Sequence, residues 1–187
     1  MKHLTAVLAT IVLLVIGLAC SGDDREKANG LVSEANKFVA EANDSVKKAE
    51  AKGNEYDARL VKITKDSELN ELREFGKEII KLYDTIKDNF DKAGAKFEEA
   101  SKLNINDKAK EYLGIKGNEM KKRGEYSAEI KRIPQALIDS KKKEEYVADA
   151  QKYGANAKKL LEEANEMAEK ANKLANDNPT LITSPGN

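Results

Sequence analysis

The chain has 187 residues, of which 33 are basic and 33 acidic, so the formal net charge at pH 7 is zero. This balance argues against a nucleic-acid-binding protein, which presents a basic surface to its ligand. The single cysteine excludes an intrachain disulfide, so packing has to stabilise the fold. Charged residues make up 35% of the chain and aromatic residues 5%, which is typical of long, charge-rich helices.

The N-terminal segment has the three-part layout of a secretory signal. It starts with the basic Lys2, continues with an almost entirely apolar stretch over residues 4–19, and becomes polar at Ser21. The apolar stretch is shorter than the ~20 residues that span a bilayer comfortably. Its end resembles the lipobox of bacterial lipoproteins, carried here by Gly17-Leu18-Ala19-Cys20. No family is recognised for the helical part that follows.

The resemblance to lipoproteins implies that residues 1–19 are a signal peptide that is removed. Cys20 would then carry a diacylglyceryl thioether and an amide-linked acyl chain such as palmitate, and two or more chains anchor a protein stably. The implied location is the bacterial cell envelope. In diderm families an Asp after the cysteine signals inner-membrane retention, so Ser21 favours the outer membrane, facing the periplasm or exposed at the surface.

Two other interpretations of the N-terminus stay open. The apolar stretch could be an uncleaved anchor helix, or an ordinary signal peptide followed by an incidental free thiol. Because an unpaired cysteine is unusual in an exported protein, lipidation is the simplest explanation for Cys20. Residues 20–24 would then form a short tether.

The first predicted helix runs from about residue 23 to residue 52. Its apolar residues recur in steps of three and four, which is a heptad seam. The seam consists of Val32, Ala35, Val39, Ala42, Val46 and Ala49. Gly53-Asn54 predicts a helix end and a turn.

The second predicted helix covers about residues 55–102. Its seam consists of Leu69, Leu72, Gly76, Ile79, Tyr83, Ile86, Phe90, Ala93, Phe97 and Ala100. Residues 64–68 are polar and the apolar positions before them are out of register, so we expect a stutter or a break there.

The third predicted helix starts after the capping residues at 104–107, and Pro134 is expected to kink or end it near Ile133. The fourth runs from about residue 139 to residue 176, with two parallel apolar rows. One row is Val147, Ala150, Gly154, Ala157, Leu161, Ala164, Ala168, Ala171 and Ala175; the other is Tyr146, Tyr153, Leu160, Met167 and Leu174. Residues 177–187 are predicted to be a tail that is disordered or loosely docked.

Together these segments predict an all-α protein, an elongated antiparallel bundle or coiled-coil hairpins of about four helices over residues 25–176. Residues 31–36 and 160–165 resemble each other, which fits either a duplicated hairpin or two unrelated alanine-rich heptads. In both cases small seam residues favour tight packing of the first helix against the fourth.

The sequence contains little that could perform chemistry. The only histidine, His3, lies in the signal segment, which removes histidine-based catalysis and the usual zinc and di-iron sites from the rest of the chain. We expect no catalytic, cofactor-binding or metal-binding residue and no enzyme activity. The acidic pairs Glu98-Glu99 and Glu162-Glu163 are interpreted as solvated helix faces.

Two functions are compatible with this pattern. The favoured one is a lipid-anchored envelope protein with a structural or scaffold role, bound to the membrane by its lipid and to a protein partner or to itself, but not to nucleic acid. The alternative is a periplasmic binding module that holds a small apolar or anionic ligand among its helices. Twelve basic and six acidic residues over 101–143 could meet an anionic partner, but a solvated helix is the favoured interpretation because the charges are spread through the segment.

Overall fold

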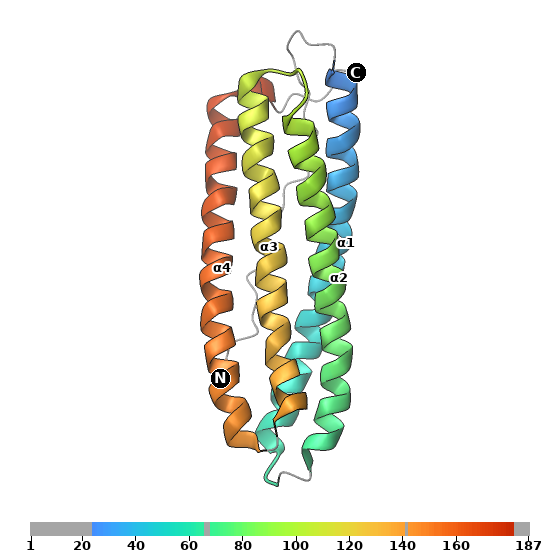
Figure 1. Ribbon diagram of the computed structural model, residues 1–187, viewed down its shortest axis with the longest axis vertical. Coiled ribbons are helices and arrows are strands. Elements are labelled where there is room, and N and C mark those ends of the chain that lie inside the picture. The colour runs from blue at the N-terminus through green and yellow to red at the C-terminus, as the bar shows by residue number, and fades with distance from the viewer. Residues whose placement is uncertain (1–23, 66–67, 141, 182–187) are drawn as a thin grey trace.

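The computed structural model describes residues 24–65, 68–140 and 142–181. It contains four long helices, α1 (Arg25–Lys62), α2 (Leu69–Ser101), α3 (Asp107–Asp139) and α4 (Lys143–Asp177), followed by the short 3-10 turn η2 (Pro179–Leu181). The helices run alternately up and down along one axis (Figure 1). The prediction of an elongated all-α bundle of four helices is confirmed for the described part of the chain.

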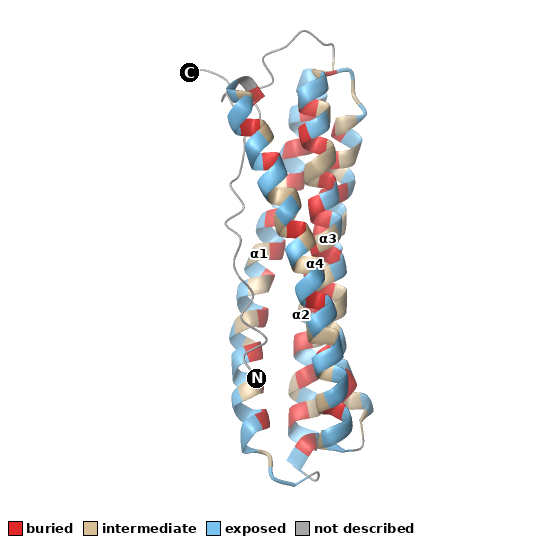
Figure 2. Cartoon of the chain, turned by 90° about the vertical axis from the view of Figure 1, so that its left-hand side faces the viewer, coloured by how far each residue is buried: buried red, intermediate tan, exposed pale blue. Residues whose placement is uncertain are grey.

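The helices pack in the order in which they follow one another in the chain. α1 packs on α2, α2 on α3 and α3 on α4, whereas α1 and α4 share no extended interface. The prediction that the first and fourth helices are close neighbours is therefore wrong. The end of α1 and the start of α4 meet at one end of the bundle, where Lys143 Nζ donates a hydrogen bond to the backbone oxygen of Ile63 at 2.7 Å. The alanine-rich stripes of α1 and α4 face α2 and α3 instead of each other, and the buried residues lie on these inward sides (Figure 2).

α1 ends ten residues later than its pattern predicts, at Lys62 instead of residue 52. The expected turn at Gly53-Asn54 does not occur, because Gly53 occupies a buried position that continues the seam from Ala49 to Tyr56 and Leu60. A buried helix face compensates for the ~1 kcal/mol that glycine costs in a helix.

The chain breaks instead after α1, as the polar residues 64–68 predict. The backbone N–H groups of Thr64 and Lys65 donate to Glu68 Oε2 at 2.9 and 3.3 Å. The Glu68 side chain thus fixes the turn that leads into α2.

α2 lies in the centre of the molecule, and all ten of its predicted seam positions are buried. It approaches α3 closely where Gly94 faces Gly117. A Cβ atom on Gly94 would lie 3.1 Å from the Gly117 backbone oxygen, and one on Gly117 would lie 3.2 Å from that of Gly94. The two helices can come this close only because neither position carries a side chain.

α3 begins at a side-chain cap and continues through its proline. Asn106 Oδ1 accepts hydrogen bonds from the backbone of Lys108 at 2.8 Å and of Ala109 at 3.4 Å. Of the kink or end expected near Ile133, the end does not occur, since the helix continues through Pro134 to Asp139. Pro134 is buried against α2, where a Cβ atom on Gly76 would lie 3.4 Å from the proline Cβ.

The end of α3 is held by α2. The Arg73 side chain donates to the backbone oxygens of Leu137 at 3.2 Å and Ser140 at 2.6 Å. These carbonyl groups have no partner inside the helix, so the guanidinium group provides one from the neighbouring helix.

α4 starts at Lys143, slightly later than its pattern predicts, and packs extensively on only one long helix, α3. Apart from Tyr146, the buried residues of α4 are all small: Ala157, Ala164, Ala171 and Ala175. Of the two alternatives for the tail, disorder does not hold for residues 177–181, because the chain forms the η2 turn and buries Leu181. Residues 182–187 lie outside the described residues.

Candidate functional site

The predicted lipidation residue Cys20 and the rest of the lipobox lie outside the described residues. The nearest described residue is Asp24, which precedes α1. Its Oδ2 atom accepts a hydrogen bond from the backbone N–H of Asn104 at 2.9 Å. The start of the helical body is therefore tied to the connection between α2 and α3.

Inside the bundle, a charged cluster lies on the buried face of α3. Glu119 Oε2 is 2.5 Å from Lys116 Nζ, and Glu119 Oε1 is 2.9 Å from Arg123 Nε. The exposed fractions of the three side chains are 1% for Glu119, 12% for Lys116 and 7% for Arg123, so one carboxylate lies between two cations with little solvent. Arg123 also reaches the side chain of Asn165 on α4, at 3.5 Å.

A second polar cluster lies where α1, α2 and α3 meet. Glu50 Oε1 is buried without a hydrogen-bond partner, and burial raises the pKa of this carboxyl group. Burial and the charge of Glu50 raise the pKa of Tyr126 to about 12, and burial likewise raises the pKa of Tyr83, to which Glu50 contributes. The carboxylate of α1 therefore faces one phenol from each of the two central helices.

Tyrosines extend this polar region toward the α1–α2 connection. The Tyr56 side chain is 1% exposed, and its hydroxyl group is buried beside the phenol of Tyr146. Burial raises the pKa of Tyr56 and brings that of Tyr146, on α4, to about 12. Tyr83 and Tyr146 occupy predicted apolar positions of their helices, which accounts for the burial of their rings.

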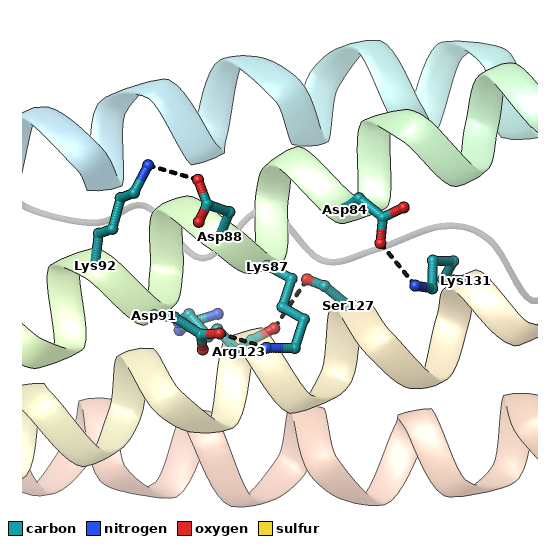
Figure 3. A network of polar contacts seen from close by, with 8 residues as sticks. All are labelled: Asp84, Lys87, Asp88, Asp91, Lys92, Arg123, Ser127 and Lys131. Carbon is teal, nitrogen blue, oxygen red and sulfur yellow. Dashed lines mark hydrogen bonds and ion pairs between the residues drawn. The ribbon is translucent and has the colours of Figure 1, made fainter.

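Charged residues join the outer edges of α2 and α3. Asp84 Oδ1 of α2 accepts a hydrogen bond from Lys131 Nζ of α3 at 2.7 Å, and Lys87 pairs with Asp91 within α2 (Figure 3). The Asp91 carboxylate lies so close to α3 that a Cβ atom on Gly124 would be 2.5 Å from its Oδ1 atom. The network holds the two helices together and leaves none of these four charges without a counter-ion.

The basic segment over residues 101–143 is largely neutralised. Nine of its twelve basic side chains form ion pairs with carboxylates, which removes most of the free positive charge that an anionic partner would need. The predicted acidic pairs are also engaged: Lys102 and Lys121 lower the pKa of Glu98 to about 2, and Glu163 lies 3.1 Å from Lys122.

The structure offers no metal-binding arrangement in its described part, where no three His, Cys, Asp or Glu side chains gather. No helix in the described ranges combines the length and apolarity of a membrane span.

The sequence pattern did not identify Glu119 as an interior group or Glu50 as a half-buried one. The spacing of Lys116, Glu119 and Arg123 was a usable signal, since residues three and four apart share a helix face. That face becomes an interior one only when α4 packs on it. Comparison with protein-family models, with curated proteins and with solved structures finds no match for the chain.

Proposed function

We propose that this protein is a lipoprotein of the bacterial cell envelope, anchored by acyl chains on Cys20, and that its helical body acts as a scaffold for a protein partner or for further copies of itself. The observation that carries the anchor is the sequence Gly17-Leu18-Ala19-Cys20, which follows an apolar stretch and precedes a polar chain. The proposed location is the outer membrane, on the strength of Ser21.

The scaffold role is supported by the way in which the body is held together. Each pair of consecutive helices is bridged by an ion pair along its outer edge: Lys96 with Glu34 at 2.6 Å, Lys121 with Glu98 at 2.5 Å and Lys122 with Glu163 at 3.1 Å. Single exposed pairs contribute only ~0–1 kcal/mol. Repeated over three interfaces and backed by a continuous apolar seam, they fit a stiff rod better than a ligand cage.

The anchor is tested by growing the producing cells with a clickable fatty acid. Wild type and Ser21→Ala should become labelled, whereas Cys20→Ser should not, because it lacks the thiol that accepts the lipid. Label on Cys20→Ser at the wild-type level would end the lipoprotein proposal. Ser21→Asp should shift the labelled protein from the outer to the inner membrane in fractionated envelopes.

The scaffold role is tested by cross-linking in intact envelopes followed by purification of the full chain. We expect a cross-linked protein or a ladder of the chain itself. A monomer that carries a bound small molecule and forms no cross-linked species would contradict this role.

One observation favours the alternative function as a binding module. Lys116 and Arg123 together carry one more positive charge than Glu119 neutralises, and all three side chains are largely buried. A small anionic ligand would balance that charge. Native mass spectrometry of the purified protein would then detect a bound anion, and Lys116→Met would lose it while the exposed control Lys158→Met kept it.

A further inference from the structure

The hydrogen bond from Asn104 to Asp24 decides where the chain enters the bundle. The Asp24 backbone oxygen accepts the N–H of Ala28 at 2.9 Å, which starts α1, while its side chain holds the α2–α3 connection. The position of Asp24 is thus fixed by contacts to α1 and to the α2–α3 connection, and a force applied to the N-terminus is transmitted to both.

This entry point lies at one end of the rod. The start of α1, the connection between α2 and α3 and the end of α4 lie together there, at the top of Figure 1. The end of α1 and the start of α4 lie at the opposite end. α1 has 38 residues, so at ~1.5 Å per residue the two ends are about 57 Å apart.

The distance from Cys20 to the body is short in comparison. Four residue steps separate Cys20 from Asp24, and a fully extended chain covers at most ~3.3–3.6 Å per residue, or about 14 Å in all. A lipid on Cys20 can therefore reach the bilayer only from the α1 start, whatever path the tether takes.

The sides of the rod offer no competing attachment to lipid. Outside residues 1–19 the chain carries 32 basic and 33 acidic residues, and the basic side chains of α3 are mostly paired with carboxylates. Attraction to an anionic leaflet needs unpaired basic residues, each worth ~1 kcal/mol near the surface. Among the described residues the only large apolar side chain that is exposed is Val61, at 79%, and it lies at the far end of α1.

From these observations, and resting on the proposed lipid anchor, we propose that the bundle stands end-on on the bilayer. The α2–α3 connection and the η2 turn face the lipid headgroups. The opposite end, where α1 and α3 finish, is held about 57 Å away and is the part of the body presented to partners.

The test uses the single cysteine of the chain. Lipidation consumes the Cys20 thiol, so a second cysteine can be labelled uniquely with a donor fluorophore in the full, lipidated protein. We choose three exposed lysines on α1, Lys27→Cys, Lys48→Cys and Lys62→Cys, and place each protein in zwitterionic vesicles that carry a lipid-headgroup acceptor. Energy transfer should be strong from position 27, intermediate from 48 and weak from 62.

Equal transfer from the three positions, as for a body that lies flat, or strongest transfer from position 62 would overturn the end-on arrangement. Vesicle flotation of the same samples separates this failure from failure of the anchor. If the protein fails to float with vesicles, the lipoprotein proposal falls, and the arrangement falls with it. Cys20→Ser carrying each labelled position should neither float nor transfer.

Asp24 is proposed as the residue that positions the tether. Asp24→Ala removes the acceptor for the Asn104 N–H, so the difference in energy-transfer efficiency between positions 27 and 62 should become smaller. Glu26→Ala removes a carboxylate from the same helical turn and should leave this difference unchanged. An unchanged difference in Asp24→Ala would overturn the positioning role of this residue, and circular dichroism of both variants checks that α1 remains helical.

Discussion

α2 and α4 have equally regular heptad patterns but very different burial. α2 has neighbours on two sides and buries twelve residues, including Ile79, Ile86 and Phe90. α4 has an extended interface with α3 only and buries five residues, four of which are alanines. The large residues of α4, such as Leu160 and Met167, are only half-buried. A heptad seam therefore identifies the face that turns inward, but the number of neighbouring helices decides how much of that face is covered.

The largest difference in unfolding free energy is expected between substitutions of two glutamates. Glu119→Ala leaves two nearly buried cations without their counter-ion, and we expect a loss of ~3–5 kcal/mol in unfolding free energy. Glu162→Ala on α4 removes an exposed pair with Lys158 and should cost less than ~1 kcal/mol. Urea denaturation followed by circular dichroism measures both. Similar losses would show that the α3 cluster is solvated in the folded protein.

A leucine pair tests the apolar side of the same comparison. Leu72 on α2 is 2% exposed, and its replacement by alanine should cost ~2–5 kcal/mol through lost contacts and a residual cavity. Leu161 on α4 has solvent on one side, so Leu161→Ala should cost less than half as much. The midpoint of thermal unfolding gives a second measure. If Leu161→Ala proved as costly as Leu72→Ala, the edge of α4 would have to be covered in solution.

Two glycines should respond with opposite signs. Gly117→Ala places a methyl group against the backbone of α2, so overpacking should destabilise the protein by ~1–3 kcal/mol. Gly154 on α4 has no atom within 4 Å of the position of a Cβ, and Gly154→Ala should stabilise the protein by ~0.5–1 kcal/mol. The two variants are measured under identical conditions. A gain for Gly117→Ala would contradict the close approach of α2 and α3.

The smallest effect concerns pH and a carboxyl group of α1. The raised pKa of Glu50 means that the folded state binds this proton more tightly than the unfolded state, so acidification through the folded pKa favours folding at this site. Glu50→Gln should therefore stabilise the protein at pH 7, by at most about 1 kcal/mol. The gain should shrink as the pH falls and vanish below the unfolded pKa near 4.5.

Glu41→Gln on the exposed side of α1 serves as the matched control and should show no such trend. Denaturant midpoints of the three proteins between pH 4 and pH 8 provide the test. A gain for Glu50→Gln that is independent of pH would rule out an ionised, buried carboxylate at this position.

Much of the helix content was readable in advance because each seam is a local property. The ten seam positions of α2 and the break at residues 64–68 are confirmed. The expected end at Gly53 is wrong, and the helix does not end at Pro134 either, since both residues are tolerated within helices once a neighbour packs on them. Propensity is a weak preference of about 1 kcal/mol for glycine, and tertiary contacts exceed it.

The interior polar groups were not predictable in the same way. Glu50 and Glu119 stand among many similar glutamates, and nothing local separates an exposed carboxylate from one that a third helix covers. Their environment depends on α1 crossing toward Tyr126 and on α4 packing beside Arg123.

The sequence by itself determined that the described chain forms four charge-rich helices, which face of each turns inward, and that no histidine follows the N-terminal segment, because these follow from composition and from a period of 3.5 residues. Only the tertiary structure decided that α1 and α4 remain apart, that α2 and α3 approach through Gly94 and Gly117, and that charged and phenolic groups lie inside. Heptad periodicity predicts that a helix packs against another helix. The identity of that partner depends on the sizes of the side chains that meet across the interface, which no single helix contains.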